Sequence, residues 1–178
     1  MKKITLIMGT NATGKSSLAR EIISFAGGCA GVIDDVTYCN DGKTALIGDY
    51  SQGKKIEGVD SFGETKFLAD KIKGIERPYI VFEGLKCGTF GLSIQKALFS
   101  GESSLVIFLY ASSKTINERL QKRSGRGINS VAVLKQQKAN LSAAIKYKEI
   151  GVPVMSFNTD NFTTQEIFEQ VKKKLYEL

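Results

Sequence analysis

Short apolar runs rich in β-branched residues alternate with segments of helical periodicity along this chain. The first run, Ile4–Met8, is almost continuously apolar, as is typical of a strand buried on both faces of a parallel sheet. Further runs of this kind lie at 31–33, 79–82, 105–110 and 152–157. The helical patterns lie near 15–26, 62–73, 89–99, 113–124, 130–149 and 162–176, with Ser61, Ser112 and Asn161 as expected N-caps. This alternation predicts an α/β fold with a five-stranded parallel sheet.

Two stretches do not fit a minimal alternation of strands and helices. Residues 40–60 contain turn signals on both sides of the strand-like Thr44–Ile47, so we expect an inserted hairpin there. Residues 119–148 form the second stretch, which we interpret as a lid followed by a basic helix. Its apolar stripe is interrupted by Lys138, and we expect the stripe to pack on the body of the protein. The stripe consists of Val131, Leu134, Leu141 and Ile145.

The length of 178 residues fits one domain, spanning residues 1–178. No apolar run approaches the roughly 20 residues that cross a bilayer, so we expect no membrane association and a cytoplasmic location. The three cysteines have no metal-ligand spacing and the chain has no histidine, which favours free thiols in a reducing compartment. The oligomeric state does not follow from the sequence.

The positive charge is concentrated in one part of the chain. The whole sequence carries a net charge of +7, whereas Ser112–Lys148 alone holds nine basic residues and the single acid Glu118, a net charge of +8. Three interpretations remain open for this segment: a solvated helix face, a lid that clamps phosphates, or a surface that binds nucleic acid.

Residues Gly9–Ser16 match the phosphate-loop pattern GxxxxGK[ST], directly after the first strand and directly before a helix. In this context the backbone amides and the helix N-terminus form a cradle for phosphate oxygens. We expect Lys15 to bridge the β- and γ-phosphates of ATP and Ser16 to ligate Mg²⁺. The predicted nucleotide-binding residues of this segment are Gly9, Thr10, Asn11, Ala12, Thr13, Gly14, Lys15, Ser16 and Ser17.

The remaining carboxylates favour a kinase over a GTPase switch. The chain has no Asn-Lys-x-Asp run, and without histidine a general base must be a carboxylate, lysine or tyrosine. Asp35, next to Asp34 at the end of the second apolar run, is the predicted base that accepts the proton of the acceptor hydroxyl. Alternatively, the pair caps a turn or holds Mg²⁺ through water. For Glu83, after the third core strand, a metal-associated, an acceptor-binding and a structural role all remain open.

Arginines follow the fourth strand at lid-like spacing. Arg119, Arg123 and Arg126 would share one helical face, and the glycines beside Arg126 indicate a hinge. We expect Arg123 and Arg126 to neutralise the phosphoryl group in transfer and Arg119 to contact the nucleotide, although a merely basic helix end is the alternative. After the last strand, the loop Asn158–Asp160 is expected to lie against the nucleotide base, with Asp160 as the predicted contact.

The order of these features resembles the nucleoside-monophosphate-kinase-like group of P-loop kinases over nearly the whole chain. The resemblance implies a three-layer P-loop fold with the strand order 2-3-1-4-5. Within the group, the short segments 47–50, 58–61, 82–84 and 123–126 look most like phage 5-hydroxymethyluracil DNA kinases. That resemblance implies ATP-dependent phosphorylation of the hydroxymethyl group of 5-hydroxymethyluracil in DNA, a step in thymine hypermodification, in the host cytoplasm.

If DNA is the acceptor, the region around residues 40–60 is expected to recognise an extruded base. Tyr38 or Tyr50 would stack on the base and Asp60 would make a polar contact. The expected substrate-binding residues are Asp34, Tyr38, Tyr50, Gly58, Val59, Asp60 and Glu83. A hairpin that only covers the sheet edge is the alternative. Two rival functions remain: a kinase of mononucleotides or other small molecules, and a non-catalytic, ATP-dependent binder of nucleic acid.

Overall fold

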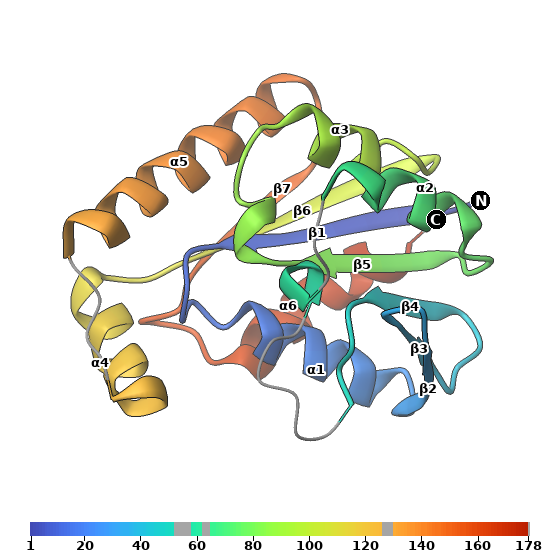
Figure 1. Ribbon diagram of the computed structural model, residues 1–178, viewed down its shortest axis with the longest axis horizontal. Coiled ribbons are helices and arrows are strands. Elements are labelled where there is room, and N and C mark those ends of the chain that lie inside the picture. Colours follow the sequence, from blue (N-terminus) through green and yellow to red (C-terminus); the bar gives the residue numbers. More distant parts are fainter. Residues whose placement is uncertain (52–57, 62–64, 126–129, 178) are drawn as a thin grey trace.

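The computed structural model describes residues 1–51, 58–61, 65–125 and 130–177. Within these ranges the strands form one sheet of seven, in the order β2-β3-β4-β5-β1-β6-β7 (Figure 1). The strands are β1 Lys3–Gly9, β2 Cys29–Ile33, β3 Val36–Cys39, β4 Thr44–Ile47, β5 Tyr79–Glu83, β6 Ser103–Tyr110 and β7 Val154–Asn158. The pairs β4–β5, β5–β1, β1–β6 and β6–β7 are parallel, whereas β2–β3 and β3–β4 are antiparallel.

The expected count of five strands is therefore wrong, although five strands do form the parallel part. In that part the second strand along the chain is β4, at Thr44–Ile47, and not the run at 31–33. All four residues of β4 are buried, as befits a strand inside the sheet, whereas β2 at the edge is largely exposed. With β4 as the second strand, the parallel part has the expected order 2-3-1-4-5.

The antiparallel strands also change the expected hairpin. Asp34 and Asp35 form the two-residue turn between β2 and β3, with φ values of 48° and 57°, the left-handed conformation that tight hairpins use. A second turn leads from β3 into β4, where the Asp41 carboxylate accepts hydrogen bonds from the Lys43 and Thr44 amides at 2.8 Å. The turn signal at residues 40–42 was thus interpreted correctly, but the strand after it belongs to the main sheet and not to an insertion.

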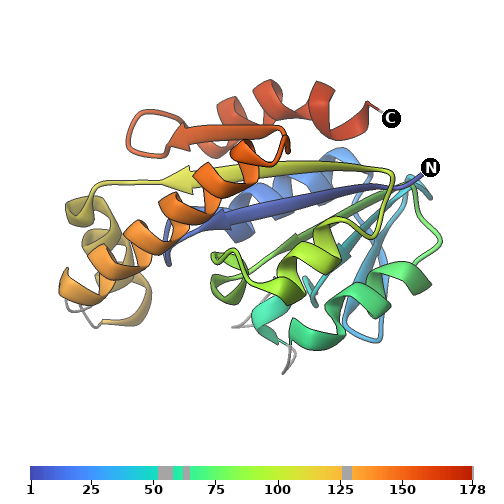
Figure 2. The same cartoon turned by 90° about the horizontal axis from the view of Figure 1, so that it is seen from above.

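Helices cover both faces of the sheet (Figures 1 and 2). α1 (Lys15–Phe25) and α6 (Thr164–Tyr176) pack on one face. α2 (Leu68–Gly74), α3 (Leu92–Leu98) and α5 (Ser130–Glu149) pack on the other. α4 (Ser113–Ser124) follows β6 at the end of the sheet where β1 meets α1. Three 3₁₀ helices complete the described elements: η1 (Gly58–Ser61), η2 (Thr65–Phe67) and η3 (Leu85–Cys87).

The caps explain where several helices begin. The Ser112 hydroxyl accepts the Thr115 amide, which confirms the expected N-cap of α4. Asn161 is not a cap, because Thr163 and Glu166 form a reciprocal capping box at the start of α6. Ser61 is not one either: it ends η1, and α2 begins seven residues later at Leu68. Residues 62 to 64, expected in that helix, lie outside the described ranges.

Helix α5 packs with the face opposite to the expected one. The stripe predicted to be buried is exposed, with 69% of Val131, 48% of Leu134, 51% of Leu141 and 48% of Ile145 accessible to solvent. The buried face carries Val133, Asn140, Ala143, Ala144 and Tyr147. Its alanines let the helix lie close to the sheet, and the Tyr147 ring packs on the Phe90 ring at a centroid distance of 4.8 Å. No helix among the described residues combines the length and apolar character that a membrane crossing requires.

Candidate nucleotide-binding and phosphotransfer site

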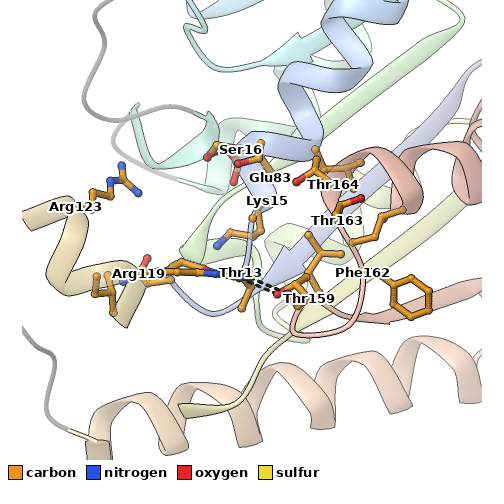
Figure 3. Close-up of a pocket in the computed structure, with 18 of the residues that line it drawn as sticks. Thr13, Lys15, Ser16, Glu83, Arg119, Arg123, Thr159, Phe162, Thr163 and Thr164 are labelled. Atoms are coloured by element: carbon orange, nitrogen blue, oxygen red, sulfur yellow. Dashed lines mark hydrogen bonds between the residues drawn. The ribbon is translucent and has the colours of Figure 1, made fainter. Parts of the chain in front are cut away.

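A cavity of about 1140 Å³ opens at the edge of the sheet where the parallel strands end (Figure 3). The loop before α1, the helix α4 and the segment between β7 and α6 supply most of its walls. The lining residues are Asn11, Ala12, Thr13, Gly14, Lys15, Ser16, Ser17, Leu18, Asp60, Glu83, Leu109, Arg119, Leu120, Arg123, Ser124, Thr159, Phe162, Thr163, Thr164 and Ile167. The structure thus brings seven residues of the phosphate-loop region, Asn11 to Ser17, into one cavity with two arginines of the predicted lid, Arg119 and Arg123.

The loop between β1 and α1 adopts a conformation that its glycines permit. A Cβ on Gly9 would lie 2.6 Å from Thr13 Oγ1 and closer still to the Leu109 carbonyl oxygen. Gly14 precedes α1 at φ 89° and ψ 14°, and no side chain caps the helix there. The first amides of α1 therefore lie at the cavity without a side-chain acceptor at the cap position, which is the arrangement that binds anions at helix N-termini.

Lys15 is folded against the loop that precedes it. Its side chain is buried, and its Nζ donates to the Thr10 carbonyl oxygen at 2.9 Å. The Thr13 hydroxyl donates to the same carbonyl oxygen at 2.8 Å. Burial lowers the pKa of Lys15, and the nearby Glu83 carboxylate opposes that shift. A bound polyphosphate would place negative charge beside this buried ammonium group and so stabilise its protonated form.

Glu83 ends β5 directly beneath the phosphate loop, where Figure 3 shows it beside Ser16 and Lys15. Its Oε1 atom accepts hydrogen bonds from the Ser16 hydroxyl at 2.9 Å and from the Tyr50 hydroxyl at 3.0 Å. Only 2% of Glu83 is exposed, and burial raises the pKa of its carboxyl group, while Lys15 and the two hydroxyl donors act in the opposite direction. The two hydrogen bonds hold the Glu83 carboxylate in a defined position at the site.

The oxygen atoms of this region fit Mg²⁺. The cavity presents the Ser16 hydroxyl and the carboxylates of Glu83 and Asp60, and hard oxygen ligands are those that Mg²⁺ prefers. The described residues contain no group of three or more acidic, cysteine or histidine side chains that could hold a metal ion. A Mg²⁺ ion at these oxygens would complete its coordination with phosphate oxygens and water.

Backbone packing brings Asp60 to the cavity. Its carboxylate accepts the amides of Leu85 at 2.6 Å and Lys86 at 3.2 Å, which ties η1 to the start of η3. Gly58, at φ 67°, lies against Glu83, and Val59 is fully buried. Of the three expected substrate residues in η1, only Asp60 lines the cavity. Gly58 packs against the wall residue Glu83, and Val59 is buried in the hydrophobic core.

Arg119 joins the three walls of the cavity. Its guanidinium group donates to the Ala12 carbonyl oxygen at 3.1 Å, to Thr159 Oγ1 at 2.9 Å and to the Thr159 carbonyl oxygen at 2.8 Å (Figure 3). Arg123, one turn further along α4, also lines the cavity. Arg126, the third arginine of the predicted lid, lies outside the described residues. The hinge was expected at Gly125 and Gly127: Gly125, in the left-handed conformation, ends α4, and Gly127 lies outside the described residues.

Asp160 does not line the cavity, in contrast to the expected contact with a nucleotide base. Its carboxylate accepts the Ser112 amide at 2.8 Å, and hydrogen bonds from Thr115 and Ser112 lower its pKa. Asp160 therefore fixes the start of α4. Thr159, from the same predicted loop, does line the cavity, whereas the wall residues Phe162, Thr163, Thr164 and Ile167 were not predicted. The sequence signal for these residues was the polar segment after the last strand. Because parallel strands end on the same side of the sheet, the residues that follow β7 lie near those that follow β1.

The predicted base Asp35 and the substrate residues Asp34, Tyr38 and Tyr50 are not part of the cavity wall. Asp34 and Asp35 are exposed at the β2–β3 turn, where the Asp35 carbonyl oxygen accepts the Gly48 amide at 2.7 Å. Tyr38 packs partly on the core, with the Arg77 guanidinium group 5.4 Å from its ring centroid. Tyr50 is 4% exposed and has no free ring face for the expected stacking on a base.

Comparisons with known proteins identify the fold. No protein-family model matches the sequence, and no curated protein matches it either. The YorR protein of Bacillus subtilis, solved in complex with phosphorylated GDP, superposes with a TM-score of 0.61 at 13% identity, covering 96% of this chain and 94% of that one. A sugar kinase from a Janibacter species gives 0.58 at 16% identity, with 99% and 96% covered. Deoxyadenosine kinase from M. mycoides with bound dATP gives 0.52 at 16% identity, with 98% and 100% covered. At these identities the likeness shows the fold alone, an α/β fold that this chain shares with these structures, two of which are kinases.

Proposed function

We propose that this protein is a P-loop kinase that transfers the γ-phosphoryl group of ATP to an acceptor hydroxyl, with Mg²⁺ as cofactor. One observation carries the proposal: the phosphate loop, Lys15, Ser16, Glu83 and the lid residue Arg123 all line a single cavity of about 1140 Å³. The likeness to kinase structures along nearly the whole chain supports the same conclusion.

The residues of the cavity suit distinct parts of phosphoryl transfer. The amides at the start of α1 and the Lys15 ammonium bind the β- and γ-phosphates, and Arg123 neutralises charge as the γ-phosphoryl group departs. Arg119, fixed by Ala12 and Thr159, faces the nucleotide from α4. Bound at Ser16, with Glu83 and Asp60 nearby, Mg²⁺ would supply charge neutralisation at the phosphates. Arg126 keeps its proposed role in the lid.

Because the chain has no histidine, the general base must be a carboxylate, lysine or tyrosine, and we propose a carboxylate. Asp35 was expected in this role, but its exposed turn lies outside the cavity wall, whereas Asp60 is part of it. We therefore assign the base to Asp60 and keep Asp35, beside Asp34, as the alternative. Glu83 is better suited to orient the proposed Mg²⁺ ligand Ser16, because its Oε1 accepts a hydrogen bond from the Ser16 hydroxyl.

For the acceptor we propose the hydroxymethyl group of 5-hydroxymethyluracil in DNA. The resemblance of the short motifs to phage kinases of this base motivates that choice. The charge of α4 and α5 supports it, because six lysines of these two helices are exposed and would attract a polyanion. They are Lys114, Lys122, Lys135, Lys138, Lys146 and Lys148. A kinase of nucleosides or other small molecules is the second candidate, favoured by the solved kinases of that kind.

Transfer of labelled phosphate tests the proposal. γ-labelled ATP is offered with DNA that contains thymine, 5-hydroxymethylcytosine or 5-hydroxymethyluracil, and in parallel with free nucleosides and sugars. Label in the 5-hydroxymethyluracil polymer alone is the expected result, with DNA affinity falling steeply as salt is added. Label only in small molecules would establish the second candidate. Binding of ATP and DNA without any transfer would leave a non-catalytic nucleic-acid binder.

A further inference from the structure

Tyr50 and Ser16 donate to the same oxygen of Glu83. The Tyr50 hydroxyl lies 3.0 Å from Glu83 Oε1, and the Ser16 hydroxyl lies 2.9 Å from it. Because Tyr50 is 4% exposed and Glu83 2% exposed, water competes little for these bonds. Hydrogen bonds to an ionised carboxylate are strong in such surroundings. Tyr50 does not line the cavity, and this bond connects it to the wall residue Glu83.

The sheet itself holds Tyr50 in place. The Thr37 hydroxyl, on β3, accepts the Tyr50 amide at 3.1 Å and donates to the Gly48 carbonyl oxygen at 2.8 Å. Thr37 is fully buried, and Gly48, at φ 123°, packs directly on the backbone of Gly58. Side chains supported by a rigid strand hold a precise geometry better than those on free loops. The Tyr50 hydroxyl is therefore held in a defined position, from which it donates to the Glu83 carboxylate.

We propose that Tyr50 is a positioning residue of this site: it holds Glu83 so that Glu83 orients the Ser16 hydroxyl toward a bound cation. The inference rests on the proposed function. A serine hydroxyl has one hydrogen and two lone pairs, so donation of the hydrogen to Glu83 leaves the lone pairs for a metal ion. Without the Tyr50 hydroxyl, Glu83 can rotate, and the Ser16 hydrogen is free to point into the cavity, where it opposes a cation.

Calorimetry with a non-hydrolysable ATP analogue, with and without Mg²⁺, separates this role from a structural one. In Tyr50→Phe we expect the gain in affinity on adding Mg²⁺ to shrink about tenfold, the size of one hydrogen bond to a charged group, while metal-free affinity is unchanged. Tyr79→Phe is the matched control. Tyr79 lies at the other end of β5, and its hydroxyl donates to the Tyr176 carbonyl oxygen at 2.9 Å, so its loss should leave both affinities unchanged.

A double variant tests whether Tyr50 acts through Glu83. In a Glu83→Ala background, Tyr50→Phe should add no further loss of the Mg²⁺-dependent gain, because the coupled partner is absent. An additional loss in that background would overturn the inference. So would an unchanged gain in Tyr50→Phe alone, provided that wild type binds the analogue and that thermal melting shows a folded variant. Failure of the wild-type protein to bind any nucleotide would instead remove the proposed function, and the inference with it.

Discussion

Gly58 lies so close to Glu83 that a Cβ at position 58 would be 2.5 Å from both the carbonyl oxygen and Oε1 of Glu83. The glycine also has φ 67°, a conformation that residues with a side chain rarely adopt. This contact sets the position of η1 relative to the end of β5. It allows the segment that carries Asp60 to lie directly on the buried carboxylate of the site.

Gly58→Ala should therefore destabilise the protein, because either the backbone or Glu83 must move. We expect the free energy of unfolding to fall by about 1–3 kcal/mol, as for other overpacked positions, when measured by denaturant unfolding. The control is Gly74→Ala, at the end of α2, where nothing lies within 4 Å of the added Cβ. Equal stability of the two variants would show that Gly58 tolerates a side chain after all.

Lys15→Ala should abolish nucleotide binding and leave the fold intact. The ammonium group is buried with its pKa lowered by that burial, so its removal does not take away a stabilising surface charge. We expect no measurable heat of ATP binding in calorimetry and a melting temperature equal to or above that of wild type. Lys96→Ala, at an exposed position of α3, is the control and should bind ATP normally. ATP binding by Lys15→Ala would contradict the proposed site.

Arg119→Ala should weaken nucleotide binding by removing the bonds that join α4 to Ala12 and Thr159. We expect a loss of at least about tenfold in affinity, since each bond to a charged group contributes about 1.5–3 kcal/mol. Fluorescence titration with a labelled ATP analogue measures the loss, and Lys122→Ala, exposed on the same helix, is the control. Equal affinities for the two variants would mean that Arg119 has no part in binding.

The base can be assigned by comparing two carboxylate variants. Asp60→Asn should lower kcat by at least about a hundredfold, the usual contribution of a general base, with little change in the KM for ATP. Asp35→Asn should leave kcat within a factor of about two, because the Asp35 side chain is exposed and is not part of the cavity wall. Steady-state phosphate transfer at saturating acceptor gives both values, and thermal melting checks the folding of each variant. The reverse pattern would restore Asp35 as the base.

The arrangement of the site could be predicted only where its residues are close in the sequence. Gly9–Ser16 supply the loop, the lysine and the hydroxyl within eight consecutive residues, so the local pattern predicts their joint position. Glu83 was placed beside the metal site as one of three possible roles, because it ends a strand at the same edge. Tyr50 was expected to stack on a base, and no sequence signal indicates that its hydroxyl meets Glu83, 33 positions further along the chain.

The sequence by itself determined the α/β alternation, the phosphate loop and the helices at 113–124 and 130–149, because caps, glycines and periodicity act over a few neighbouring residues. Tertiary structure decided which strand lies beside β5, which face of α5 is buried and which carboxylates reach the cavity. Apolar periodicity predicts that a segment is buried but does not identify its partner, and in α5 the predicted apolar stripe is exposed. Thr44–Ile47 became an inner strand because it pairs with both β3 and β5, while the core clusters on the two sides of the sheet bury Ala45 and Ile47 on one face and Leu46 on the other.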